Sequence, residues 1–368
     1  MVILFIDENF DFSWRTLSWE KSLNNLFRLQ RRLFISFFVF DVKKALSIQK
    51  LILKSNSARL LAIRDVTQIS SGRKVAGIDG KTFLTFRERF ELNENLKLNF
   101  NNWEPDVLRK VFLSKKGYES DFLLVPTISD RVWYSLVKFS IEPIHESTFH
   151  PRSYGFRTSR SVHQLQKLIF LHLSKNSYGL QKRFMYVHLS KIFSIFDHTF
   201  LLRSIVSPRG IKVGISRCLE RGFCPEFLEK IDNTFGLESL FSNILINNIE
   251  KIHSCVRYGY HMLFFLKPFD DEIIILKKIL AFLQYRFMNY SEIQTYIFSS
   301  FIGFDFLEWH FKVSTDGSSF STPSFGNYQK FLKRVKHIIN NSNYGAVRFK
   351  KILLQSYYFF LRLDFKIC

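Results

Sequence analysis

The stretch of sequence that decides the fold is Val125-Pro126-Thr127-Ile128-Ser129-Asp130-Arg131, followed by Ser153-Tyr154-Gly155-Phe156-Arg157-Thr158-Ser159-Arg160-Ser161-Val162-His163. Residues Leu123–Pro126 have the character of a short strand end. The apolar spacing that follows predicts a helix over Arg131–Ile144 that stops before His145. Residues Pro151–Ser161 form a basic, glycine-containing segment, which predicts a loop.

The same spacing rules predict elements on both sides of this stretch. Before it, Ser18–Leu61 has helical periodicity, Ser70-Ser71-Gly72 interrupts the pattern, and Gly77–Gly80 is a turn. After it, the expected elements are a strand at Phe184–Leu189, a helix near His198–Ile205, two short strands in Cys255–Leu266, a helix over Asp270–Phe287, hairpin strands in Phe298–Val313 and helix from Pro323 onward. Helices mixed with non-adjacent strands predict the α+β class.

Composition restricts the partner and the compartment. The 368 residues include 53 Lys and Arg against 32 Asp and Glu, a net charge of +21, and 46% are hydrophobic. This combination favours a folded protein with a polyanionic partner, most often nucleic acid. No apolar run approaches the ~18–20 residues that span a bilayer, so no membrane is expected. The four cysteines suit a reducing compartment.

Phenylalanine is over-used, with 43 residues against 14 Tyr and 5 Trp. No folding rule requires this, and an AT-rich organellar genome accounts for it. Residues Met1–Phe10 contain Asp7 and Glu8 and lack Arg and Ser, unlike a transit peptide. We therefore expect a protein made in the chloroplast where it works, with the mitochondrion as the alternative.

Several segments together resemble the group II intron reverse transcriptase/maturase family. They are Gly72–Gly80, the paired stretches quoted above, Phe301-Ile302-Gly303-Phe304, and Pro323-Ser324 with the following Lys330–Ile339. The resemblance implies a right-hand, reverse-transcriptase-like arrangement. Its parts would be a helical RNA-binding N-terminal extension (1–90), fingers (91–183), a degenerate palm (184–315) and a short α-helical, domain X-like thumb (316–368).

The resemblance also implies where polymerase chemistry would lie. A polymerase holds two divalent metals about 3.5–4 Å apart with carboxylates. The family's metal-binding Asp on the first palm strand aligns with His188, and the paired Asp of its Y-A-D-D turn align with Tyr260 and His261. The family also has a basic residue five positions before the fingers proline and a lysine before the position of Thr295. Asp121 and Gln294 occupy these two positions here. We expect no catalytic residues, metal or cofactor, with His188, Tyr260 and His261 as degenerate positions.

Three other metal arrangements are compatible with the sequence. Phe269-Asp270-Asp271 could be a shifted catalytic turn, although capping of the following helix is the better interpretation. His188 and His261 could bind a softer metal with Cys255, and Cys218 with Cys224 could bind zinc, but neither spacing matches a zinc motif.

What remains is a basic surface that can contact RNA phosphates. The candidate contacts lie in four segments: the N-terminal helices, the glycine turns, the fingers and the thumb-like region. They are Arg31, Arg32, Lys43, Lys44, Arg73, Lys74, Lys81, Arg131, Arg152, Arg157, Arg160, Lys330, Lys333, Arg334 and Lys336. The excess is clustered, because Arg28–Lys81 holds twelve basic and three acidic residues, and Pro323–Cys368 holds nine and one.

The favoured function is therefore an RNA-binding maturase that assists splicing of a group II intron and has lost reverse transcription. The alternative is an active RNA-directed DNA polymerase whose metal site is misaligned here. A decaying reading frame whose product needs a second, fuller maturase as partner is a third hypothesis.

Overall fold

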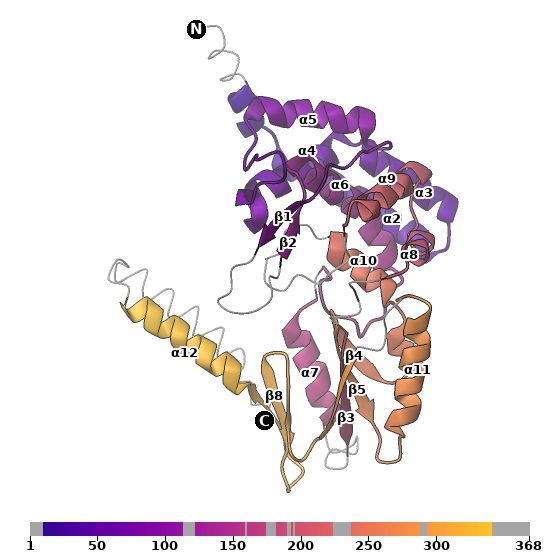
Figure 1. Cartoon of the computed structure of the whole chain (residues 1–368), viewed down its shortest axis with the longest axis vertical. Helices are drawn as coiled ribbons and strands as arrows, with labels where there is room; N and C mark the ends of the chain where they lie inside the picture. The colour runs from indigo at the N-terminus through magenta and orange to yellow at the C-terminus, as the bar shows by residue number, and fades with distance from the viewer. Residues whose placement is uncertain are drawn as a thin grey trace. The chain divides into compact units, whose positions relative to one another are not determined.

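The computed structural model describes residues 10–112, 122–158, 160–173, 182–189, 193, 196–223, 237–287 and 293–340 (Figure 1). Internal contacts divide the chain into two units. Unit 1 comprises Met1–His150, Ser190–Ile249 and Leu280–Glu292, and unit 2 comprises Pro151–Leu189, Glu250–Ile279 and Ile293–Cys368. These bounds differ from the predicted ones, since the later part of the predicted fingers groups with the predicted palm strands.

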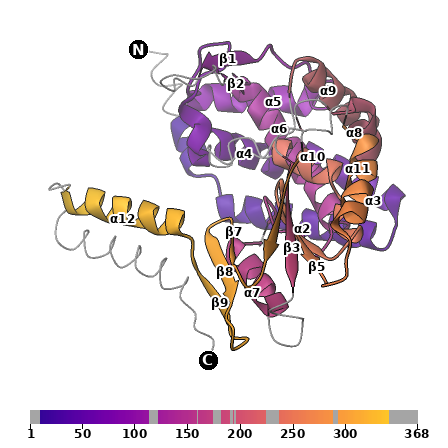
Figure 2. The same ribbon diagram turned by 60° about the horizontal axis from the view of Figure 1, so that its bottom comes forward.

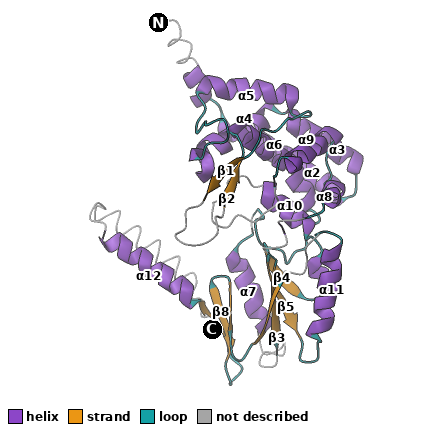
Figure 3. Ribbon diagram, in the orientation of Figure 1, coloured by secondary structure: helices purple, strands orange, loops and turns teal. Residues whose placement is uncertain are grey.

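Unit 1 is mainly helical (Figure 3). Its helices are α2 (Trp19–Phe38), α3 (Val42–Lys54), α4 (Asn56–Arg64), α5 (Phe86–Asn99), α6 (Ile128–Glu146), α8 (His198–Ser204), α9 (Arg209–Glu220) and α10 (Leu237–Leu245). A short antiparallel pair, β1 (Arg109–Phe112) and β2 (Phe122–Val125), precedes α6. The predicted N-terminal helices and the strand end at Pro126 are confirmed.

Helix α6 forms the centre of unit 1. Its side chains are buried around most of the helix, and it contacts α2, α3, α4 and α10. A helix that is apolar on all sides is a core helix. The helix continues through Pro143 to Glu146, so the prediction that it stops before His145 is wrong.

The neighbouring helices explain why α6 continues through Pro143. Proline has no N–H, so it cannot bond the carbonyl four residues earlier, which belongs to Phe139. Gln30 of α2 donates its side-chain amide to the Phe139 carbonyl at 3.1 Å. Gln49 of α3 donates to the Ser140 carbonyl at 3.0 Å. Side chains from α2 and α3 therefore supply bonds to the α6 carbonyls in this turn.

Unit 2 contains a four-stranded antiparallel sheet in the order β4-β5-β3-β6. The strands are β3 (Arg183–His188), β4 (Cys255–Tyr258), β5 (His261–Leu266) and β6 (Gln294–Ser299). A second sheet joins β7 (Phe304–Phe306), β8 (Trp309–Val313) and β9 (Ser319–Pro323), drawn side by side in Figure 2. The helices of this unit are α7 (Val162–Leu173), α12 (Phe325–Asn340) and the first part of α11 (Glu272–Gln284), which is divided between the two units after Ile279.

The core of unit 2 lies where α7 and the β7-β8-β9 sheet cover one face of the larger sheet. Leu165 and Ile169 of α7 pack with Phe184, Val256 and Leu263 of the sheet. The predicted hairpin in Phe298–Val313 is confirmed only for β7 and β8, because β6, which contains Phe298, pairs with β3 instead. The mixture of helices and antiparallel sheets confirms the α+β class.

Within the described ranges, no helix is both long enough and apolar enough to cross a bilayer.

Candidate nucleic-acid interface and the degenerate metal site

The strands that carry the aligned catalytic positions are neighbours in the sheet. His188, the last residue of β3, lies directly opposite His261, the first residue of β5. The two rings are 4.8 Å apart between centroids, and the Tyr260 ring is 4.8 Å from that of His188. Nδ1 of His261 is 2.6 Å from the Tyr186 hydroxyl. The structure thus brings His188, Tyr260 and His261 together, as the alignment requires.

The side chains of this cluster differ from the ligands that a polymerase uses. Mg²⁺ prefers oxygen ligands, and the two-metal mechanism needs several carboxylates at one point. Imidazole and phenol rings occupy the aligned positions here. Across the part of the chain that the structure describes, no three His, Cys, Asp or Glu side chains are arranged to hold a metal ion.

The Asp270-Asp271 pair lies at the other end of β5. His261 begins this strand and Leu266 ends it, so the ends are about 16 Å apart at ~3.3 Å per residue. Asp271 accepts a hydrogen bond from the Ile273 amide at 2.8 Å, where α11 begins. Asp270 accepts from the Lys267 amide and pairs with His253. Both carboxylates therefore secure the entry to α11, which supports the capping interpretation.

Cys255 does not join the two histidines. It pairs with Phe264 in the register of β4 and β5, whereas His261 pairs with Tyr258. Side chains alternate between the faces of a sheet, so Cys255 and His261 lie on opposite faces. Burial also raises the pKa of the Cys255 thiol, and that of the Cys218 thiol to about 12. Both thiols are therefore protonated in the metal-free protein; Cys224 lies outside the described residues.

The Ser153–Arg157 motif packs directly against the β4–β5 turn. The amide of Tyr154 donates to the Arg257 carbonyl at 2.8 Å, and the amide of Arg257 donates to the Arg152 carbonyl at 3.0 Å. The Arg257 side chain is fully buried and pairs with Glu250 at 2.5 Å. A buried, paired arginine beneath the turn fixes the backbone that carries Tyr260 and His261.

The Val125–Arg131 motif also holds neighbouring backbone segments together. Arg131 is 1% exposed. Its guanidinium donates to the Pro126 carbonyl at 2.9 Å and to the Val75 carbonyl at 2.6 Å. Desolvation lowers the pKa of Arg131 to about 10. A Cβ atom on Gly77 would lie 2.7 Å from Cα of Thr127, so the glycine turn fits closely against this motif.

Two predicted RNA contacts are therefore corrected. Arg131 is buried, as described above, and Arg157 is buried and donates to the Ser153 carbonyl at 2.5 Å. Both guanidinium groups hold backbone carbonyls, so neither presents its charge to a phosphate. Arg152 is half-buried and donates to the Ser254 hydroxyl. Arg160 is the exposed member of the fingers set, with its guanidinium over the Tyr154 ring.

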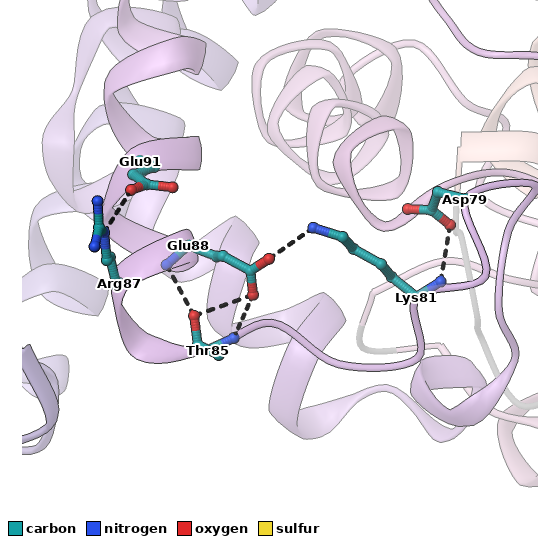
Figure 4. Close-up of polar contacts among 6 residues, drawn as sticks. All are labelled: Asp79, Lys81, Thr85, Arg87, Glu88 and Glu91. Atoms are coloured by element: carbon teal, nitrogen blue, oxygen red, sulfur yellow. Dashed lines mark hydrogen bonds and ion pairs between the residues drawn. The ribbon is translucent and has the colours of Figure 1, made fainter. Parts of the chain in front are cut away.

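Lys81 is exposed, but an acidic side chain already compensates its charge (Figure 4). Its Nζ lies 2.6 Å from Glu88, and that hydrogen bond raises the pKa of Lys81 and lowers the pKa of Glu88. Glu88 also accepts from the amide and hydroxyl of Thr85, which forms the capping box of α5. Lys81 thus pairs with the capping residue at the start of α5 and is a weak candidate for RNA contact.

The remaining predicted contacts lie on the surface in three groups. Those of α2 and α3 are Arg31, Arg32, Lys43 and Lys44; those before the glycine turn are Arg73 and Lys74; those of α12 are Lys330, Lys333, Arg334 and Lys336. All of these side chains are exposed. None of the α2, α3 and α12 cations forms an ion pair within the described part of the chain.

Sequence reasoning missed two tyrosines beside the aligned catalytic positions. Tyr186 and Tyr296 are cross-strand partners on β3 and β6, with ring centroids 6.1 Å apart. The alternation Phe184, Tyr186, His188 along β3 is the signal that could have found the first, because residues two apart share a face.

The comparisons with known proteins agree with this picture. The family described as the N-terminal domain of reverse transcriptase matches residues 14–96. Maturase-like protein 1 of Euglena gracilis is 48% identical over 339 residues, which cover 91% of this chain and 73% of that protein. Maturase-like protein 1 of Euglena longa is 46% identical over 336 residues, which cover 90% and 73%.

A more distant relative is the group II intron-encoded protein LtrA of Lactococcus lactis subsp. cremoris. It is 28% identical over 165 residues, which cover 42% of this chain and 26% of that protein. The matched segments and the fold thus define a reverse-transcriptase-like protein. With relatives of this identity and coverage, the chain belongs to the group II intron-encoded reverse transcriptase/maturase family.

Proposed function

We propose that this protein binds group II intron RNA and assists its splicing without copying RNA into DNA. The observation that carries the proposal is the direct pairing of His188 with His261, where a polymerase needs carboxylates. A maturase requires only that the protein bind the folded intron more tightly than the open one, which needs no metal at this point.

The parts of the chain fit this role. The β4-β5-β3-β6 sheet is the degenerate palm, and the Ser153–Arg157 part of the fingers motif packs against its β4–β5 turn. The helical N-terminal extension and α12, the start of the thumb-like segment, supply exposed cations for phosphates. The phenylalanine-rich composition and the Euglena relatives support an organellar site of action, for which we favour the plastid.

Primer extension tests the loss of polymerase activity. The full chain, with a primed RNA template, deoxynucleotides and Mg²⁺ or Mn²⁺, should give no extension above a reaction without protein. Extension that Asp270→Asn or Asp271→Asn abolishes would show that the catalytic turn lies there and would overturn the proposal. Asp316→Asn, in an exposed turn of the β8–β9 hairpin, is the matched control for loss of one carboxylate.

RNA capture tests the binding half. The protein should enrich intron-containing organellar transcripts over spliced ones, which sequencing of the captured RNA measures. Equal recovery of intron and exon sequence would remove the support for a maturase. If capture needs another maturase in the extract, the second-partner hypothesis gains support.

A further inference from the structure

The end of the four-stranded sheet that contains His188 and His261 carries several neighbouring rings. The strand register places Tyr258, His261, His188 and Gln294 side by side across the four strands. The next row on the same face contains Val256, Leu263, Tyr186 and Tyr296. Further along, Phe265, Phe184 and Phe298 form a third row.

Burial increases from the first row to the third. Phe184 and Phe265 are covered and belong to the core beneath α7 and the β7-β8-β9 sheet. In contrast, Tyr186, His188, Tyr260 and His261 are only half-buried, and Tyr296 is 51% exposed. Phe306 of β7 supports this group from the core side, with its ring 6.0 Å from that of Tyr186 and 6.5 Å from that of His261.

The rings are mutually ordered. The Tyr186 ring is stacked with those of His188, His261 and Tyr296 at centroid distances of 6.1, 6.0 and 6.1 Å. The hydrogen bond between Tyr186 and His261 fixes both side chains. Rings that are already held lose little conformational entropy when a planar ligand stacks on them.

We propose that the rings at this end of the sheet and its β4–β5 turn (Tyr186, His188, Tyr260, His261 and Tyr296, together called the aromatic row) form a platform on which bases of single-stranded RNA stack. The proposal rests on the proposed function and names the RNA conformation that this site takes. The sheet has the β-α-β-β-α-β strand order of the ferredoxin-like motif. RNA recognition motifs likewise use aromatic side chains on a four-stranded sheet to stack two or three bases.

Charge and chemistry both favour single-stranded RNA as the occupant. The described residues of unit 2 include 16 Lys and Arg against 7 Asp and Glu, so the unit attracts a polyanion. Bases within a duplex stack on one another and do not expose their faces, whereas those of loops and single strands do. The site therefore distinguishes single-stranded from double-stranded RNA by stacking, and charge contributes to the binding of both.

Neutral substitutions separate stacking from charge. In the double variant His188→Leu/Tyr296→Leu, affinity for a fluorescein-labelled ten-nucleotide oligouridylate should fall about tenfold. Affinity for a blunt-ended RNA duplex of the same length should change less than twofold. His188→Phe/Tyr296→Phe should restore oligouridylate binding, because the rings remain. Tyr285→Leu, an exposed tyrosine outside the row, is the matched control.

Each outcome decides the proposal. Unchanged oligouridylate affinity in the leucine variant, or an equal loss with the duplex, overturns it. Wild-type protein that binds intron RNA but not oligouridylate overturns the platform and leaves the proposed function standing, whereas protein that binds neither overturns both. If the leucine variant does not fold, crosslinking of wild-type protein to 4-thiouridine RNA tests the platform instead. Crosslinks at the aromatic row support the platform, and crosslinks confined to α2, α3 and α12 overturn it.

Discussion

Gly155 lies where the Ser153–Arg157 motif crosses the β4–β5 turn. A Cβ atom at this position would be 2.1 Å from the Gly259 nitrogen, and the neighbouring atoms are backbone. Gly155→Ala therefore forces the two backbones apart and should lower the free energy of unfolding by about 1–3 kcal/mol. Urea denaturation measures this. Gly326→Ala is the control, because nothing lies within 4 Å of the added atom. Equal midpoints for both variants would contradict the close approach.

His145 makes stability depend on pH. Burial and the nearby charge of Lys212 lower its pKa from 6.5 to about 4 in the folded protein. Between these two values the unfolded chain binds the extra proton, so stability falls as the pH is lowered through this range. Between pH 7 and pH 5 this costs about 2 kcal/mol.

The variant His145→Gln should lose this share of the pH dependence. Urea midpoints at pH 7 and pH 5 measure the difference between variant and wild type. His172, whose pKa burial also lowers to about 4, keeps its own share in both proteins. A variant with the same pH dependence as wild type would show that His145 is not buried as a neutral ring.

At the scale of the element, the start of α5 depends on its capping box. The Thr85 hydroxyl accepts from the Glu88 amide, and Glu88 accepts in return from the Thr85 amide. Thr85→Ala should cost about 1 kcal/mol of stability, as for other N-cap residues. Arg87→Ala removes only an exposed pair with Glu91 and should cost about 0.5 kcal/mol or less. Thermal denaturation compares the two, and a larger loss for Arg87→Ala would exclude the capping account.

The sequence predicted the individual helices and strands better than the contacts and pairings between them. Periodicity located the N-terminal helices and the β4–β5 pair, because each depends on local spacing. It failed at the end of α6, where amides of Gln30 and Gln49 from distant helices bond the carbonyls around Pro143. Periodicity also failed to predict that β6 pairs with β3, because these strands are far apart in the sequence.

The candidate site shows the same difference between what local sequence predicts and what long-range contacts decide. The alignment placed His188 and His261 at one point, and the strand register brings them together. The basic residues were predicted from charge alone, which does not distinguish a phosphate contact from a buried guanidinium. Arg131 and Arg157 belong to motifs that hold the fold, and only their burial reveals this.

At the scale of the whole molecule, charge and stacking have different roles. Counterions released by Lys and Arg give affinity for any RNA and make it depend on salt, with about 0.7–0.9 in log–log slope for each phosphate contact. Rings add little to that slope and discriminate among RNA conformations. The exposed cations of α2, α3 and α12 should therefore dominate intron affinity, while the aromatic row adjusts which RNA segment is held.

Two cluster variants test this division. One changes Arg31, Arg32, Lys43 and Lys44 to Ala, and the other changes Lys330, Lys333, Arg334 and Lys336 to Ala. Each should weaken intron binding and splicing stimulation more than His188→Ala/His261→Ala does. Each should also reduce the salt slope by up to about 3, since up to four phosphate contacts are lost. Filter binding between 50 and 200 mM salt measures the intron affinity and its salt slope, and a splicing assay measures the stimulation.

A matched control removes the same charge from positions that are already paired. Arg15, Lys81, Arg87 and Lys97 are exposed, and each forms an ion pair with an acidic side chain of its own segment. Changing these four to Ala lowers the net charge as much as either cluster variant does. The control should nevertheless keep most of the salt slope, because paired cations release few counterions on binding. If it loses as much slope as the clusters, net charge alone drives RNA binding. If the two histidines prove more damaging than either cluster, the palm holds the intron and the assignment to α2, α3 and α12 fails.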